Sequence, residues 1–189
     1  DWYFIHTCGR SWDDHMASIK TSHAKKLRRY CRKPYKYGYS IALKEGRKLS
    51  KSVLHRCYEL LCETMAFNHD SNLYSEESFA AFVRSHPDGV FLATRDVDGL
   101  VLGFNTGPVV GHDHSAEFRS WGVYHGLFIA FAKHEFQRGA AAVDLGNTND
   151  DFKLELGGRG ETVTFQLRSG CSLRSALCLA GWALSSMLP

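Results

Sequence analysis

The spacing of apolar and polar residues divides the first part of the chain into strand, helix and strand. Short apolar runs at 2–7 and 39–45 predict the two strands. Between them, apolar residues recur every three or four positions from Trp12 to Tyr30, which is typical of one buried helix face. The expected boundary signals of this helix are Ser11 as its N-cap, with Pro34 and Gly38 as its end.

The same patterns continue through the rest of the chain. The turn sequence "VDG" between two apolar runs predicts a β-hairpin. Further strands are expected at 114–121, 141–146 and 162–168, and helices at 50–67, 75–86, 122–139 and 171–187, with a short helix or turn at 150–158.

The helix at 122–139 is apolar on nearly every side, so it is expected to be buried. It lies between the strands at 114–121 and 141–146, and a strand–helix–strand unit of this kind predicts a parallel crossover. The predicted fold class is therefore mixed α/β (α+β), with a central parallel βαβ unit and helices on both faces of a mixed sheet.

Composition limits the classes of protein that remain. A chain of 189 residues with 44% hydrophobic residues can bury a core of its own. No apolar run is long enough to predict a membrane span, and no signal peptide is visible, so a cytoplasmic location is expected. The six cysteines include no C-x-x-C pair, which favours free thiols in a reducing compartment. The abrupt start in a strand suggests a fragment of a longer protein.

The net charge is only +3, but it is unevenly distributed. Residues 1–51 hold 13 Lys and Arg against 4 Asp and Glu, whereas residues 52–189 hold 10 against 16. The basic helix has three interpretations: contact with the phosphates of a nucleotide-linked or tRNA-linked substrate, direct binding of nucleic acid, or a solvated face above a buried apolar stripe. The third is favoured, and tRNA remains an open partner that the sequence does not favour.

Two stretches resemble the GNAT (N-acetyltransferase) superfamily, in particular the Fem-type aminoacyltransferase-like proteins and the acetyltransferases associated with cellulose and peptidoglycan synthesis. They are "SWDDHMASIKTSHAKKLRRYCRK" and "GVYHGLFIAFAKHEFQRGAAAVDLGNTNDDFKLELGG". The resemblance covers about 11–168. It implies that 1–49 is a strand and basic helix leading from an N-terminal lobe of the same protein, and that 50–189 is a GNAT-like acyltransferase lobe.

The resemblance also implies a donor site. The strands at 114–121 and 141–145 would separate, and the donor, acyl-CoA or another activated acyl compound, would enter between them. Its pyrophosphate would meet the unpaired amides and positive dipole at the start of the following helix. The expected loop corresponds to Arg119, Gly122, Val123 and Tyr124. Arg119 and Gly122 match its pattern, whereas Tyr124 departs from the usual small residue.

Lys153 follows a strand whose carboxyl end is where ligands bind in open α/β sheets. It is a candidate for holding a carboxylate, a phosphate or the oxyanion of acyl transfer, and the resemblance places the matching lysine near the transfer centre. Asp144 would orient Lys153 or the acceptor, or would cap the following turn. Asn147 and Thr148 are the candidate acceptor contacts. The competing interpretation makes Lys153 a solvated helix lysine.

Amine acylation also needs a general base, for which Glu117, His125 and His114 are the candidates. The stretch "GHDHS" at 111–115 does not define a metal site without further ligands, so no metal is expected. The sequence thus predicts a GNAT-type acyltransferase that moves an acyl or aminoacyl group to the amine or hydroxyl of a small-molecule or nucleotide-linked acceptor. The alternative is a non-catalytic module whose basic helix docks an anionic polymer, nucleic acid or a partner lobe.

Overall fold

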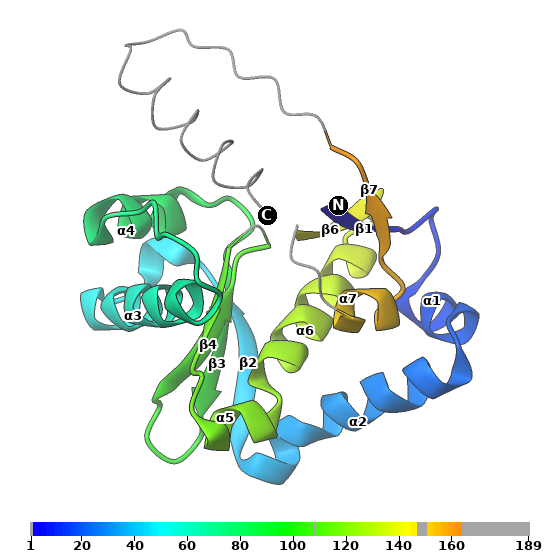
Figure 1. Ribbon diagram of the computed structural model, residues 1–189, viewed down its shortest axis with the longest axis horizontal. Coiled ribbons are helices and arrows are strands. Elements are labelled where there is room, and N and C mark those ends of the chain that lie inside the picture. The colour runs from blue at the N-terminus through cyan, green and yellow to red at the C-terminus, as the bar shows by residue number, and fades with distance from the viewer. Residues whose placement is uncertain (1, 108, 147–150, 164–189) are drawn as a thin grey trace, which may run out of the picture.

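The computed structural model describes residues 2–107, 109–146 and 151–163 of the chain, and its fold is mixed α/β. Two sheets face each other across a long central helix, and further helices cover the outside (Figure 1). The predicted mixed α/β class is therefore confirmed, whereas the predicted central parallel βαβ unit is not seen. The expected strand at 162–168 lies largely outside the described residues, and the expected helix at 171–187 lies wholly outside them.

The larger sheet has four strands in the order β2-β3-β4-β5, and each pair is antiparallel. The predicted hairpin is its centre, because β3 and β4 pair across the "VDG" turn. The bounds of the strands are β2 Tyr39–Lys44, β3 Val90–Arg95, β4 Val101–Asn105 and β5 Val110–His112.

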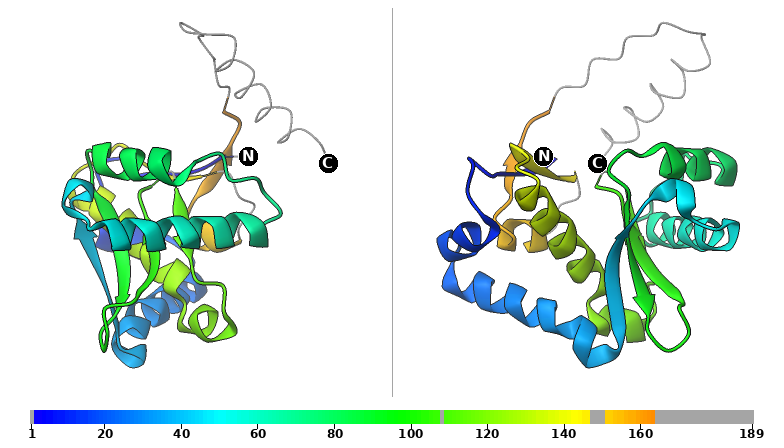
Figure 2. Two further views of the ribbon diagram at one scale, coloured as in Figure 1. Left: turned by 90° about the vertical axis from the view of Figure 1, so that its left-hand side faces the viewer. Right: turned by 180° about the vertical axis from the view of Figure 1, so that it is seen from behind.

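Helices cover both faces of this sheet, as the sequence predicted. Helices α3 (Lys51–Phe67) and α4 (Glu76–Ser85) pack on one face, and α6 (Val123–Gln137) packs on the other (Figure 2). Strand β3 serves both sides because neighbouring side chains point in opposite directions. Leu92 joins the core under α3 and α4, whereas Ala93 joins the core under α6.

The smaller sheet joins the start of the chain to its later part. Strand β1 (Trp2–His6) lies between β6 (Ala142–Gly146) and β7 (Arg159–Glu161), and both pairings are antiparallel. A short helix, α7 (Asp151–Glu155), precedes β7. The sheet rests on the C-terminal half of α6, so β1 and β6 bury their apolar residues in the same core as that helix.

The predicted basic helix is two helices, α1 (Trp12–Ser18) and α2 (Thr21–Tyr37). They separate because Ile19 has an extended backbone that ends α1. Ser11 is the N-cap, as predicted, and forms a capping box with Asp14. Gly38, at φ 68°, ends α2 in the left-handed conformation, and Pro34 lies inside the last turn rather than stopping the helix.

The segment at 114–121 was predicted to be a strand, and that prediction is wrong. It contains α5 (Ala116–Trp121), whose N-cap Ser115 accepts a hydrogen bond from the Phe118 amide. The strand ends earlier, at His112, because the carboxylate of Asp113 accepts the Ser115 amide and turns the chain into the helix. The central parallel unit is consequently not seen, and all strand pairs in the described part of the chain are antiparallel.

The other helices begin and end close to the positions that the apolar pattern of the sequence predicted. Ser50 and Ser75 cap α3 and α4, and Gly139 adopts a positive φ just after α6. A short 3-10 turn, η1 (Gly46–Lys48), precedes α3. Among the residues that the structure describes, no helix is long and apolar enough to cross a membrane.

Candidate functional site

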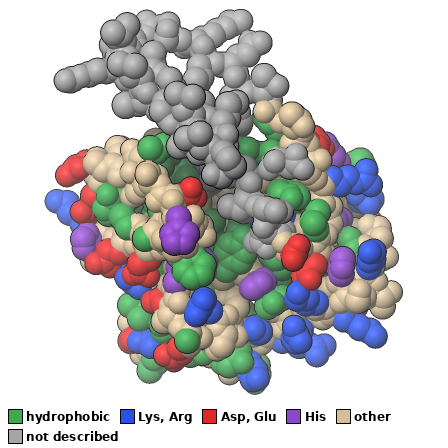
Figure 3. All heavy atoms as spheres, viewed as in Figure 1, with side chains coloured by type: hydrophobic (Ala, Val, Ile, Leu, Met, Phe, Trp, Pro, Cys, Tyr) green, Lys and Arg blue, Asp and Glu red, His purple; other side chains and the backbone are tan. Residues whose placement is uncertain are grey.

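A cavity of about 480 Å³ lies between the two sheets. Its walls include Val110 and His112 from β5 and Leu145 and Gly146 from β6, which are edge strands of different sheets. The ends of α3 and α5 and the first turns of α6 complete the lining. Hydrophobic and histidine side chains gather at the centre of this face (Figure 3). The resemblance implied that a donor would enter between two parallel strands that separate. The cavity in this structure lies instead between two antiparallel sheets.

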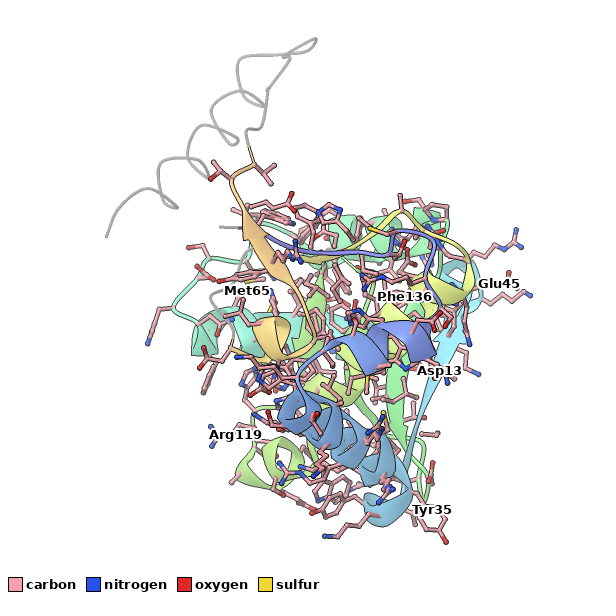
Figure 4. The ribbon with its side chains drawn as sticks, turned by 90° about the vertical axis from the view of Figure 1, so that its right-hand side faces the viewer. Asp13, Tyr35, Glu45, Met65, Arg119 and Phe136 are labelled. Atoms are coloured by element: carbon pink, nitrogen blue, oxygen red, sulfur yellow. The ribbon has the colours of Figure 1, made fainter. Side chains whose placement is uncertain are left out.

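The four residues predicted to bind the donor all line this cavity: Arg119, Gly122, Val123 and Tyr124. The strand expected before them is α5, so two helices meet at Gly122 in place of a strand–loop–helix connection. Arg119 is exposed at the rim, on the same side of the molecule as Met65, another lining residue (Figure 4). Because the positive end of the α6 dipole lies at this rim, the rim attracts anions.

Gly122 is required at this junction for two reasons. Its φ of 71° is strained for other residues, and a Cβ at this position would lie 3.0 Å from side-chain atoms of both Tyr30 and Lys33. The ammonium of Lys33 also donates to the Ser120 carbonyl at 2.7 Å, so α2 holds the end of α5 in place. The backbone at the start of α6 is therefore fixed by α2.

Lys153 is 2% exposed and lines the inner part of the cavity from α7. Its Nζ lies 5.6 Å from the ring centre of Phe128 and 5.9 Å from that of Tyr3. Aromatic faces attract cations, and this contact is stronger away from water. The interpretation of Lys153 as a solvated surface lysine is wrong, because its side chain is buried.

Two stacked histidines form another wall of the cavity. The rings of His112 and His114 are 4.0 Å apart, and His112 lies 5.2 Å from the ring of Tyr124. Burial, and secondarily the charge of His114, lowers the pKa of His112 to about 4. His112 is therefore neutral at physiological pH.

The protonated ring nitrogen of His112 follows from its partner. The Nδ1 of His112 lies 3.2 Å from the Asp113 carbonyl, which can only accept a hydrogen bond, so Nδ1 carries the hydrogen and Nε2 has the free electron pair. Thr64 of α3 holds this segment in place, because its hydroxyl accepts the His112 amide at 3.1 Å and contacts Nε2 of His114 at 3.1 Å.

The other residues predicted for the site differ in whether they line the cavity. His125 lines the cavity but stacks on Tyr30, with 4.0 Å between ring centres. Glu117 is exposed in the first turn of α5 and does not line the cavity. The Asp144 carboxylate accepts bonds from the Trp2 indole at 2.5 Å and from the Gly146 amide at 2.7 Å, so it caps the following turn. Asn147 and Thr148 lie outside the described residues.

Sequence reasoning missed His112 as a candidate base and Thr64 as its support. The stretch "GHDHS" contains both histidines, but only His114 was predicted as a candidate base. In the described ranges, no group of three or more His, Cys, Asp or Glu side chains is arranged to hold a metal ion. Thr64 lies 48 residues away in sequence and carries no local signal.

No protein-family model matches this chain, and no curated protein matches it by sequence. Its fold is similar to the solved structure of L-PGS from Bacillus licheniformis, with a TM-score of 0.56 over 95% of this chain and 11% sequence identity. At that identity the similarity shows the fold alone. The chain spans 63% of the length of that protein.

Proposed function

We propose that this domain is a GNAT-type transferase that moves an acyl or aminoacyl group to an amine or hydroxyl acceptor in the cavity between the two sheets. The observation that carries the proposal is the buried side chain of Lys153 in the same cavity as the start of α6 and a neutral histidine. The structural neighbour L-PGS, a lysyl-phosphatidylglycerol synthase and so an aminoacyl transferase, is consistent with this reaction class.

The chemistry requires three tasks, and the cavity offers a group for each. The start of α6 and the Arg119 guanidinium would hold the phosphates of an activated donor, acyl-CoA or another acyl compound. As the acceptor attacks the acyl carbon, the carbonyl oxygen gains negative charge, which Lys153 would stabilise. The new bond forms as the bond to the leaving group breaks.

The acceptor must also lose a proton. The free Nε2 electron pair of His112 would accept this proton, and the neighbouring His114 is a second candidate. These histidines replace Glu117 in the proposed mechanism, because Glu117 does not line the cavity. Asp144 has a structural task in the proposal, since its carboxylate accepts the Gly146 amide at the end of β6.

A donor-binding experiment tests the proposal. Thermal unfolding of the chain would be measured with acetyl-CoA, longer acyl-CoA compounds and UDP-sugars, because a ligand of the native state raises the melting temperature. We expect one donor class to give a shift that Arg119→Ala reduces. Donor turnover with amine and hydroxyl acceptors would then be followed by mass spectrometry.

Lys153→Met is the decisive variant. We expect transfer to fall by about 10²-fold or more, which is the usual cost of losing one oxyanion contact. The melting temperature of the variant would be measured in parallel, so that a loss of transfer is distinguished from a loss of folding. The matched control is Lys133→Met, which removes an exposed lysine from α6 and should leave transfer unchanged. Full activity in Lys153→Met would contradict the proposed role.

A further inference from the structure

A buried histidine outside the cavity contacts the segment that carries Lys153. His15 belongs to α1, is 2% exposed and does not line the cavity. Its Nε2 lies 2.8 Å from the carbonyl oxygen of Leu156, the residue that follows α7. Helices α1 and α7 lie side by side in both Figure 1 and Figure 4. The start of the chain is thereby joined to the helix that places Lys153 in the cavity.

The bond to Leu156 is the polar contribution of His15. A carbonyl oxygen can only accept, so Nε2 carries the hydrogen. Burial lowers the pKa of His15, so the ring is neutral near pH 7 and its Nδ1 carries no hydrogen. Within the described residues, that Nδ1 is buried and has no hydrogen-bond partner. Because an unpaired buried acceptor costs free energy, the donated bond is what distinguishes His15 from an apolar core residue.

Helix α7 needs contacts of this kind to have a fixed position. It has only five residues, and helices of that length are not stable on their own in water. Lys26 of α2 donates to Glu155 at 2.7 Å, but these side chains are 38% and 19% exposed, and partly exposed ion pairs contribute little. The bond from His15 is buried and therefore constrains the position of α7 more strongly.

The turn that follows α7 is packed tightly between His15 and Lys153. Gly157 has a φ of 92°, and a Cβ at this position would lie 2.7 Å from Cε1 of His15. The Gly158 amide donates to the Lys153 carbonyl at 2.8 Å, and a Cβ on Gly158 would lie 2.8 Å from that same oxygen. The backbone between the two residues therefore has little space in which to move.

The His15 ring is itself held from behind. Its centre lies 5.6 Å from the ring centre of Trp12 and 5.0 Å from that of Phe136, a residue of α6. The hydroxyl of Ser18 donates to the His15 carbonyl at 2.8 Å. A fixed ring on one side and a tight turn on the other connect α6 and α1 to the backbone of Lys153.

We infer that His15 is a positioning residue, whose bond to Leu156 fixes the turn after α7 and so holds Nζ of Lys153 in the cavity. The consequence for catalysis rests on the proposed role of Lys153 in transfer. The positioning itself can be measured without any reaction. A displacement of about 1 Å in a reacting group can lower a rate by about 10²-fold, so a residue that touches no substrate can still be required.

The first test locates the Lys153 side chain by NMR. The whole chain would be labelled with ¹³C at lysine Cε, and the Lys153 signal would be identified by its absence from Lys153→Met. Ring currents should separate this signal from those of exposed lysines, because Nζ lies 5.6 Å from the ring centre of Phe128 and 5.9 Å from that of Tyr3.

His15→Leu cannot donate to Leu156, so it should move the Lys153 signal toward the position of the exposed lysines. His15→Gln retains a donor of similar reach and should restore most of the original position. Gly157→Ala disturbs the same contact from the other side, since its Cβ would meet the His15 ring, and should move the same signal. This variant takes the place of His15→Leu if that protein does not fold.

The second test measures transfer. We expect kcat to fall by about tenfold or more in His15→Leu, because Lys153 no longer meets the developing charge correctly. The KM for the donor should stay within about twofold, since the donor-loop residues are unchanged. His15→Gln should keep kcat within about threefold of the original value. A merely structural role would not produce this separation of kcat from KM or its rescue by Gln.

Val83→Ala is the control for a general loss of stability, because Val83 is buried in the separate core under α3 and α4. It should lower the melting temperature but leave the Lys153 signal and kcat unchanged. An unmoved Lys153 signal in His15→Leu, or an equal movement in Val83→Ala, would overturn the positioning role. A moved signal in His15→Leu, combined with no transfer by the unmodified chain, would support the positioning role and contradict the proposed function.

Discussion

The environment of His112 decides how the chain responds to acid. Its imidazole is buried beside His114, and these two causes lower its pKa to about 4 from an ordinary value near 6.5. The unfolded chain then binds more protons than the folded chain between about pH 6.5 and pH 4. The stability that neutral His112 contributes is present above pH 6.5 and is lost as the pH falls through that window.

We therefore expect the free energy of unfolding to fall by about 1–2 kcal/mol between pH 7 and pH 5 because of this residue. Urea unfolding at both pH values measures the change. His112→Gln removes the titrating group, so the difference between the two pH values should become smaller. An unchanged pH dependence in the variant would assign the effect to other groups, such as His15, whose pKa burial also lowers.

The burial of Lys153 is decided by residues that are distant from it in the sequence. Its position in the sequence suggested both a functional and a solvated role, and only burial distinguishes them. The aromatic faces of Tyr3 and Phe128 come from β1 and α6, which are far from Lys153 in sequence. No local pattern around residue 153 indicates those neighbours.

At the scale of elements, the junction of α5 and α6 positions the rim of the cavity. Gly122 ends one helix and begins the next, and Tyr30 and Lys33 of α2 pack directly against it. The geometry of the proposed donor site therefore depends on α2 as well as on the helices that carry its residues.

Gly122→Ala should destabilise the chain by about 1–3 kcal/mol, because it adds a strained backbone and a contact with Tyr30 and Lys33. Gly139→Ala is the matched control, since Gly139 has a similar φ of 73° but no atom within 4 Å of the added Cβ. It should cost about 1–2 kcal/mol from the backbone alone. Thermal unfolding of both variants gives the comparison, and equal costs would show that the packing against α2 is unimportant.

At the scale of the whole molecule, the chain start and the later elements share one core. Ile5 of β1 and Leu27 of α2 belong to the same buried cluster as Leu127 of α6 and Val143 of β6. Strand β1 is also the middle strand of its sheet. The hypothesis of a separate lobe at 50–189 therefore has a physical test.

We expect a fragment of residues 50–189 to lack a cooperative thermal transition, because it loses the middle strand of one sheet and the helix that packs on α6. The intact chain, measured by circular dichroism under the same conditions, is the control. A sharp transition in the fragment would show that 50–189 folds independently and would support the predicted division at residue 49.

The sequence by itself determined the elements whose signals are local. The hairpin of β3 and β4, the cap at Ser11 and the all-round apolar pattern of α6 were predicted and are confirmed. These signals depend on neighbours within a few residues, so the chain alone reveals them. The four predicted donor-loop residues all line one cavity, and their role in donor binding stays a prediction.

Only the tertiary structure decided what depends on distant contacts. Residues 114–121 contain enough apolar and aromatic side chains for a strand, but Asp113 and Ser115 cap a helix there, and the sheet already ends at β5. The burial of Lys153 and the support of His112 by Thr64 join segments far apart in the chain. Such contacts form because packing brings the segments together, and their free energies are not encoded in any local pattern of residues.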